Sequence, residues 1–306
     1  MTARPAPLID GLAGLSRGQA LARLTAAFAD AGIDTPETDA RLLLAHALDI
    51  TRLTLATERD AIISAIDAAR IAAAARRRLS HEPVSRIIGE RWFYGRPFKI
   101  TPATLDPRPE SETLIEAALA LVRESGLAPR DIRLLDIGTG TGCLALTLLA
   151  ELPGATGIGT DISDAALAVA VENGRRLAEA SPLTIDWRCG AGLGPVSGQT
   201  FNLIVSNPPY ISHAVLARLD PDVRQFDPHL ALDGGPDGLT VYRRLIAPLP
   251  SYLPTGWVVF EVGSSQAAAV AELLRTAFAP VPMDIRTFAD LAGVQRCVAA
   301  SPRTTN

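Results

Sequence analysis

The chain has 306 residues, 48% of them apolar and 20% charged, which is typical of a soluble globular protein with one large and one small core. A formal net charge of -4 excludes a global basic field for nucleic acid, and the three cysteines and four histidines lack the spacing of a disulfide framework or metal site. Since no signal core or run of ~20 apolar residues occurs, we predict a cytoplasmic protein without a membrane segment.

Residues 1–82 are predicted to form a small helical domain. Apolar residues at helical spacing predict helices over about residues 16–31, 36–48 and 60–79. The third ends in Arg76-Arg77-Arg78, whose charges complement the helix dipole, with a phosphate contact as the less favoured alternative. Because this segment contains no cluster of acids, bases or nucleophiles, we expect it to recognise the substrate and to contribute nothing to chemistry.

Residues 83–107 are predicted to form a hairpin linker, since apolar and aromatic residues there surround Gly89 and Gly95. Pro107-Arg108-Pro109-Glu110-Ser111-Glu112 follows and opens a helix to about Glu124. Two prolines around an arginine make a stiff turn that can cover a ligand, although a simple capping segment would have the same composition.

Residues 108–306 alternate between strand and helix patterns. Such alternation predicts an α/β fold with a mostly parallel, doubly wound sheet and right-handed crossovers. Strands are expected over residues 134–137, 158–161, 184–188, 203–206, 257–262, 282–288 and 296–300, and helices over residues 143–151, 165–180, 241–248 and 267–278.

A glycine-rich loop, Gly138-Thr139-Gly140-Thr141-Gly142, joins the first of these strands to its helix. Its glycines allow the backbone to approach a ligand closely, and Asp161 ends the next strand, where it can accept both hydroxyls of a ribose. A dinucleotide fingerprint requires glycine or alanine where Cys143 stands, and no basic residue in the loop answers a pyrophosphate. The pattern therefore favours a nucleoside ligand without phosphates, S-adenosylmethionine, over a purely structural turn.

The strand at residues 203–206 ends abruptly in Asn207-Pro208-Pro209-Tyr210. The Asn207 amide oxygen and the Pro208 carbonyl can both accept a hydrogen bond from an N–H group, and Tyr210 offers a flat ring to a planar substrate group. Ligands of open α/β folds lie at the carboxyl ends of the strands. The tetrad is therefore interpreted as a clamp for a planar amino group, against the simpler interpretation of a strand-ending turn.

These motifs together resemble the glutamine N5-methyltransferases of the HemK/PrmC family, which modify class I peptide-chain release factors. The resemblance runs nearly end to end, and it implies a Rossmann-like class I methyltransferase domain, residues 108–306, after the helical domain and hairpin linker. Its further motifs are Asp39-Ala40-Arg41-Leu42-Leu43-Leu44, Asp227-Pro228-His229-Leu230-Ala231-Leu232-Asp233-Gly234-Gly235, Glu261-Val262-Gly263 and Asp290-Leu291-Ala292-Gly293.

By position, the resemblance implies that Gly138, Thr139, Gly140, Thr141 and Gly142 surround the methionine part of the cofactor and that Asp161 binds its ribose. It also makes Asn207, Pro208, Pro209 and Tyr210 the catalytic, substrate-binding residues, with Asn207 adjoining the cofactor as well.

The sequence departs from the family at the adenine edge, where an acid is usual after the third strand and Ala191 and Gly192 stand instead. We therefore expect backbone groups at Gly192 to replace a side-chain contact with the adenine. Asp227 stands where the family usually has glutamate, which is a milder change.

The expected activity is methylation of a glutamine side-chain amide in a class I release factor by a monomeric enzyme that does not bind nucleic acid directly. Positioning and polarisation of the amide nitrogen are expected to carry the reaction, without a general base. Three alternatives stay open at this point: a ribosomal-protein glutamine methyltransferase, an adenine-N6 nucleic-acid methyltransferase, and a non-catalytic module that keeps only the fold.

Overall fold

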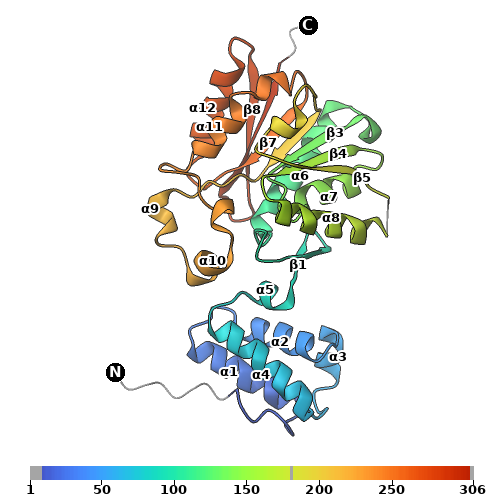
Figure 1. Ribbon diagram of the computed structural model, residues 1–306, viewed down its shortest axis with the longest axis vertical. Helices are drawn as coiled ribbons and strands as arrows, with labels where there is room; N and C mark the ends of the chain where they lie inside the picture. Colours follow the sequence, from blue (N-terminus) through green and yellow to red (C-terminus); the bar gives the residue numbers. More distant parts are fainter. Residues whose placement is uncertain (1–8, 180–181, 304–306) are drawn as a thin grey trace. The chain divides into compact units, whose positions relative to one another are not determined.

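The computed structural model describes residues 9–179 and 182–303 of the chain. The chain divides into two compact units, residues 1–89 and 90–306, each with its own core (Figure 1). The boundary falls within the predicted linker, because residues 84–88 are helical and the hairpin begins only at Glu90.

The first unit is helical, as predicted. Its helices are α1 (Arg17–Asp30), α2 (Pro36–Ala47), α3 (Arg52–Thr57), α4 (Ala65–Leu79) and α5 (Val84–Ile88). The short helix α3 was not predicted, and α4 begins at Ala65 instead of near residue 60. The reason is a cap: the Ser64 side chain accepts a hydrogen bond from the Asp67 amide and thereby fixes the first turn. Leu24, Phe28 and Leu44 lie fully buried in the core of this unit.

The arginine run at the end of α4 is ion-paired within the first unit. Arg76 pairs with Asp10 at 2.6 Å and Arg77 with Glu82 at 2.6 Å. Arg78 is buried and pairs with Asp39 of α2 at 2.7 Å. These ion pairs tie α4 to other segments of the unit. The arginine run therefore forms specific ion pairs within the unit, which is neither the purely dipolar role that we predicted nor the alternative of a phosphate contact.

The second unit opens with the antiparallel hairpin β1 (Glu90–Phe93) and β2 (Arg96–Lys99). Phe93 and Phe98 pack edge to face with ring centroids 6.2 Å apart, which anchors the hairpin in the core of this unit. The turn at residues 107–112 follows as the 3-10 helix η1 (Pro109–Ser111), and it leads directly into α6 (Glu112–Ser125).

The sheet of the second unit has seven strands in the order β5-β4-β3-β6-β7-β9-β8. The first five are parallel, β9 is antiparallel to β7, and β8 is antiparallel to β9. The strands are β3 (Arg133–Ile137), β4 (Thr156–Asp161), β5 (Thr184–Cys189), β6 (Leu203–Ser206), β7 (Trp257–Glu261), β8 (Met283–Ala289) and β9 (Gln295–Pro302). The predicted α/β sheet is thus confirmed. The strand order reverses between β3 and β6, which is where such sheets bind ligands.

Helices cover the two faces of the sheet as a doubly wound fold requires (Figure 1). One core joins the sheet to α6 and α7 (Cys143–Glu151), and α8 (Asp164–Ala178) contacts β4 and β5. The other core joins the sheet to α11 (Thr240–Ile246) and α12 (Ala267–Phe278). The predicted end of the second helix of this region, residue 180, lies outside the described residues.

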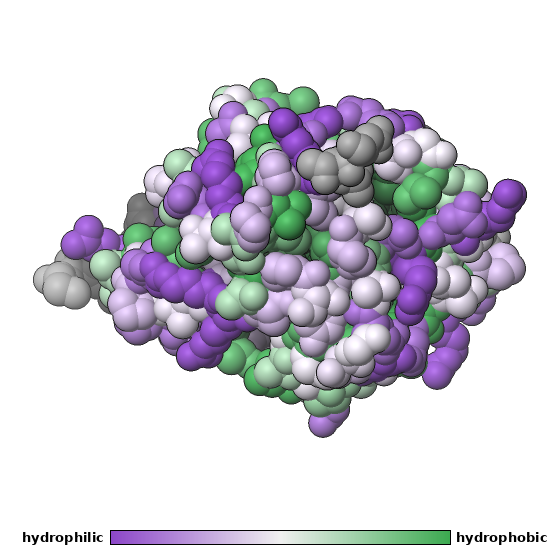
Figure 2. Space-filling view, turned by 90° about the horizontal axis from the view of Figure 1, so that it is seen from above, coloured by the Kyte–Doolittle hydropathy of each residue, from purple (hydrophilic) through white to green (hydrophobic). Residues whose placement is uncertain are grey.

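The connection from β6 to α11 contains only short helices, α9 (His213–Leu216), α10 (Pro221–Phe226) and η4 (His229–Ala231). The remaining 3-10 turns are η2 (Pro129–Asp131), η3 (Gly194–Val196) and η5 (Leu249–Ser251). Across the described residues, no helix has the length and hydropathy needed to span a membrane. On the face seen in Figure 2, hydrophilic and hydrophobic residues are interspersed.

Candidate active site

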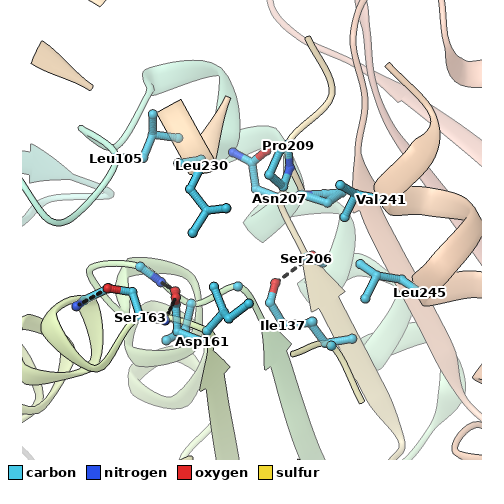
Figure 3. Close-up of a pocket in the computed structure, with 18 of the residues that line it drawn as sticks. Leu105, Ile137, Asp161, Ser163, Ser206, Asn207, Pro209, Leu230, Val241 and Leu245 are labelled. Carbon is cyan, nitrogen blue, oxygen red and sulfur yellow. Dashed lines mark hydrogen bonds between the residues drawn. The ribbon is translucent and has the colours of Figure 1, made fainter. Parts of the chain in front are cut away.

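A cavity of about 790 Å³ lies at the carboxyl ends of β3, β4 and β6, at the strand-order reversal. Leu105 and Leu230 lie across the cavity from Ile137 and Asp161 (Figure 3). The lining comes from segments distant in sequence, namely residues within 103–111, 137–141, 143–144, 161–166, 190–194, 206–209, 228–233 and 241–252. The fold thus brings the glycine loop, Asp161 and the Asn207 turn around one volume.

The glycine loop is held to the end of β4 by its backbone. The amides of Gly138 and Thr139 donate to the Thr160 carbonyl at 2.8 and 2.9 Å. Gly138 and Gly140 have φ angles of 73° and 56°, and an added Cβ at either would meet nothing within 4 Å. These two glycines therefore satisfy the backbone conformation and leave the cavity side of the loop open.

Gly142 is packed differently from Gly138 and Gly140. It is absent from the lining of the cavity, and an added Cβ would lie 3.0 Å from Trp187 and 3.1 Å from Leu146. Its φ of 79° favours glycine, and the loop packs closely onto β5 and α7 at this point. Thr139 and Thr141 do line the cavity, as predicted for this segment.

Asp161 ends β4 with its carboxylate on the cavity wall. Its Oδ2 accepts from the Gly140 amide at 2.9 Å and its Oδ1 from the Ser163 amide at 2.9 Å (Figure 3). Each carboxylate oxygen retains a further lone pair for a ligand hydroxyl. The Asp161 carboxylate thus holds the glycine loop in place, and each of its oxygens can still accept a hydrogen bond from a ligand in the cavity.

The predicted adenine edge is built from backbone and apolar side chains. Ala191 and Gly192 line the cavity, and an added Cβ at Gly192 would lie 3.1 Å from Leu245. Ile162, Leu193 and Leu245 complete this wall. Sequence reasoning missed these three, because each belongs to an apolar pattern that equally describes core residues.

The Asn207 turn brings two hydrogen-bond acceptors to the cavity. Asn207, Pro208 and Pro209 line it, and the Asn207 Nδ2 donates to the Ser111 hydroxyl at 3.3 Å. Among the described residues, neither the Asn207 side-chain oxygen nor the Pro208 carbonyl accepts a hydrogen bond. Two carbonyl oxygens from consecutive residues therefore remain available to one planar NH₂ group.

Tyr210, whose ring is predicted to pack against a planar substrate group, lies beside the cavity and not in its lining. Its hydroxyl donates to the Glu261 Oε1 at 3.4 Å. Gly234 makes room for its backbone, because a Cβ there would lie 2.7 Å from the Tyr210 carbonyl carbon. Its ring packs against the core between the sheet, α11 and α12. Tyr210 therefore supports the Asn207 turn from behind.

The turn at residues 107–112 lines the cavity through Pro107, Arg108 and Ser111. Arg108 forms an ion pair with the buried Asp227, whose carboxylate also accepts from the Asp106 amide at 3.4 Å. The aspartate at the family's usual glutamate position is thus long enough to join the turn to the segment that carries Leu230.

Two buried carboxyl groups near the site, those of Asp136 and Glu261, have raised pKa values. Burial raises the pKa of Asp136 to about 7, although hydrogen bonds from the Thr139 hydroxyl and the Ala145 amide oppose the shift. Burial likewise raises the pKa of Glu261 to about 7, against opposing effects of Ser111 and Arg296. Both are at most 2% exposed, and each has one carboxyl oxygen without a hydrogen-bond partner among the described residues.

We expect Asp136 to make stability depend on pH. Its folded pKa of about 7 lies above the ordinary value near 3.9, so the stability it contributes is present below about pH 4 and lost as the pH rises through about 7. Asp136→Asn should therefore reduce the decline in the unfolding free energy between pH 5 and pH 8, measured by urea titration. The exposed Asp131 provides the control, since Asp131→Asn should leave the decline unchanged. An unaltered decline in Asp136→Asn would contradict the assignment.

The described residues contain no group of three or more His, Cys, Asp or Glu side chains that could hold a metal ion. A parallel sheet with a glycine loop after β3, an acid at the end of β4 and an Asn-Pro-Pro turn after β6 defines a class I S-adenosylmethionine-dependent methyltransferase. The catalytic domain of hMettl16, in complex with MAT2A 3'UTR hairpin 6, has a similar fold. Its TM-score is 0.53 at 19% identity over 68% of this chain and 76% of that chain.

Family models for the PrmC N-terminal domain and the methyltransferase small domain match residues 19–89 and 115–220. The release factor glutamine methyltransferase of Cereibacter sphaeroides is 45% identical over 89% of this chain and 93% of its own. The release factor glutamine methyltransferase of Bradyrhizobium diazoefficiens is 43% identical over 95% of this chain and 96% of its own. The chain belongs to the release factor glutamine methyltransferase family.

Proposed function

We propose that the protein methylates the side-chain amide nitrogen, N5, of a glutamine in class I peptide-chain release factors, with S-adenosylmethionine as the methyl donor. The observation that carries this proposal is the pair of acceptors, the Asn207 side-chain oxygen and the Pro208 carbonyl, on the wall of the cavity. A primary amide has two N–H donors in one plane, which matches two adjacent carbonyl oxygens.

The chain offers a complementary site for the cofactor. Asp161 would hold the ribose hydroxyls, and the backbone of Gly138 and Gly140 would lie against the methionine part. The backbone at Gly192 and the side chain of Leu245 would face the adenine. The openness of the loop on its cavity side and the apolar wall at Leu245 both fit this ligand. When bound, the cofactor supplies an electrophilic methyl group on a sulfonium.

The residues at the Asn207 turn compensate for the low nucleophilicity of an amide nitrogen. Its nitrogen lone pair is delocalised into the carbonyl group, so two acceptors on the NH₂ group increase the electron density on nitrogen and fix its direction. Positioning of this kind can supply about 7–11 kcal/mol of barrier reduction. The product proton can leave to water, and we assign no general base.

The proposed division of labour follows the chain. Residues 1–82 recognise the protein substrate, residues 83–107 link the parts and contribute residues 103–107 to the wall of the cavity, and residues 108–306 carry the rest of the methyltransferase site. The match of residues 19–89 to the PrmC N-terminal domain supports this assignment of the first part. We further propose that the enzyme acts as a monomer in the cytoplasm, where its release-factor substrates function in translation termination.

Removal of residues 1–89 should weaken the binding of a whole release factor by at least about tenfold, the equivalent of 1.4 kcal/mol. Cofactor affinity should change by less than about twofold, because the residues around the cavity all belong to the second unit. Isothermal titration calorimetry measures both. Equal losses in the two affinities would mean that the first unit only keeps the second one folded.

The function is tested by incubating the protein with labelled S-adenosylmethionine and, separately, a release factor, ribosomal proteins and an adenine-containing oligonucleotide. Mass spectrometry of the products locates the methyl group. We expect label on one glutamine of the release factor. Label on a ribosomal protein alone, or on adenine alone, would overturn the proposal in favour of the corresponding alternative.

A further inference from the structure

The cavity wall proposed to face the adenine is built from two segments. Residues 190–194 follow β5, and α11 packs against them, since a Cβ added at Gly192 would lie 3.1 Å from Leu245. Val241 and Leu245 of α11 line the cavity (Figure 3), and Arg244 lines it with them. Residues three and four apart share one face of a helix, so Arg244 lies on the face of α11 that meets this wall.

The Arg244 guanidinium group has no hydrogen bond or ion pair with any residue in the described part of the chain, and its residue is exposed. The other basic residue that lines the cavity, Arg108, is ion-paired with Asp227. The preceding residue of α11, Arg243, is ion-paired with Asp237 at 2.5 Å and does not line the cavity. A guanidinium group has five N–H donors and no acceptor, so Arg244 can only donate to a ligand.

The same wall offers few hydrogen-bond acceptors. Among the described residues, neither of the acids that line the cavity belongs to the two segments of this wall. The carbonyl groups of Ala191 and Gly192 already accept hydrogen bonds, from the Gly194 amide at 3.2 Å and the Thr160 hydroxyl at 3.4 Å. Tyr252 is the other polar side chain of the wall, and its hydroxyl can donate as well as accept.

Adenine presents acceptors in its ring nitrogens, such as N3 and N7, and a donor in its 6-amino group. A wall with an unpaired guanidinium group and engaged carbonyl groups complements the ring nitrogens. Resting on the cofactor placement proposed above, we propose that Arg244 binds the adenine of S-adenosylmethionine by donating to its ring nitrogens. The site thus recognises the base by its acceptors, and Arg244 is a specificity-determining residue of the cofactor site.

The placement of Arg244 favours the base over the carboxylate of the cofactor. The methionine part is proposed to lie against Gly138 and Gly140, which follow β3, and β3 lies two strands away from β5 in the sheet. The face of α11 that carries Arg244 meets the segment after β5. A planar, weakly hydrated guanidinium group also suits a planar, neutral base better than a compact ammonium group would.

The test is calorimetric binding of S-adenosylhomocysteine to the full chain and to two variants. Arg244→Ala should raise the Kd about tenfold, the scale of one lost charge-assisted hydrogen bond. Arg243→Ala is the matched control, and it should change the Kd by less than about twofold because Arg243 does not line the cavity. The thermal unfolding midpoint establishes that both variants are folded.

A second ligand identifies the part of the cofactor that Arg244 contacts. The compound 5′-methylthioadenosine retains the adenine and the ribose but lacks the carboxylate and the amine. Arg244→Ala should weaken its binding about tenfold as well. A loss confined to S-adenosylhomocysteine would assign Arg244 to the carboxylate and overturn the proposal.

A third ligand tests which groups of the base are recognised. It is the analogue of S-adenosylhomocysteine that carries hydrogen in place of the 6-amino group. The wild-type protein should bind this analogue within about fivefold of S-adenosylhomocysteine, because a site without an acceptor for the amino group loses little with it. Binding weakened by about a hundredfold or more would show that the amino group is recognised, and it would overturn the proposal.

The wild-type measurement keeps this proposal distinct from the cofactor placement on which it rests. If the wild-type protein binds no S-adenosylhomocysteine, the placement itself fails. If the wild-type protein and Arg244→Ala bind it equally well, the placement stands and the role of Arg244 is wrong. A raised KM for the release factor in that variant would then assign Arg244 to the protein substrate.

Discussion

Asn207→Ala should lower kcat for glutamine methylation by about a thousandfold or more, because it removes one of two acceptors that hold the reacting amide. Cofactor affinity should remain within about twofold, since the residues proposed to hold the ribose and methionine parts follow β3 and β4 and not β6. Steady-state kinetics with a release factor and calorimetry with S-adenosylmethionine measure the two effects separately.

Asn207→Asp should also have a strongly reduced kcat, although aspartate has nearly the same shape and still accepts hydrogen bonds. It loses the NH₂ donor that contacts Ser111 and places a negative charge beside the cationic sulfonium. That charge stabilises the bound cofactor more than a transition state in which the positive charge is dispersing. Cofactor affinity should therefore hold or rise while kcat collapses.

A matched control is available on the same strand. Asn202 lies at the opposite end of β6, where its side-chain oxygen accepts from the Arg133 amide at 2.9 Å, and an aspartate can still accept there. Asn202→Asp should leave kcat within about twofold of wild type. Near-wild-type turnover by Asn207→Asp would show that acceptance alone suffices, and it would remove the argument for an oriented amide.

Asp161→Ala should reduce S-adenosylmethionine affinity by at least about a hundredfold. Each charge-assisted hydrogen bond is worth about 1.5–3 kcal/mol, and the carboxylate can accept from both ribose hydroxyls. The substitution also releases the amides of Gly140 and Ser163, so the glycine loop loses part of its support. Calorimetry measures the loss, and circular dichroism establishes that the fold persists.

Asp164 provides the control for charge at this end of the sheet. It lies three residues further along, in the first turn of α8, and does not line the cavity. Asp164→Ala should therefore change cofactor affinity by less than about twofold. Unchanged affinity in Asp161→Ala would mean that the ribose is bound elsewhere.

The sequence by itself determined the class of fold and the place of the site. Apolar runs of β6, such as Leu203 to Val205, are continuous because a central parallel strand is buried on both faces. Gly138, Asp161 and Asn207 each follow or end such a strand. Parallel strands align their carboxyl ends, so linear order was sufficient to predict that these residues meet.

Tertiary structure alone decided what surrounds those motifs. Gly142 and Tyr210 belong to motifs predicted to contact ligands, yet they face Trp187 and Glu261. The identity of a glycine or tyrosine does not reveal which neighbour requires it. The partners lie on other strands and helices, and only packing determines the direction of a side chain.

The contact between Ser111 and Asn207 illustrates the same limit most clearly. Ser111 has the sequence context of an ordinary helix cap, but the structure shows no capping bond from its side chain. Its hydroxyl instead accepts a hydrogen bond from the Asn207 side chain, which directly follows β6. The residues that form the site follow from local pattern, whereas their hydrogen-bond directions depend on contacts between segments far apart in the chain.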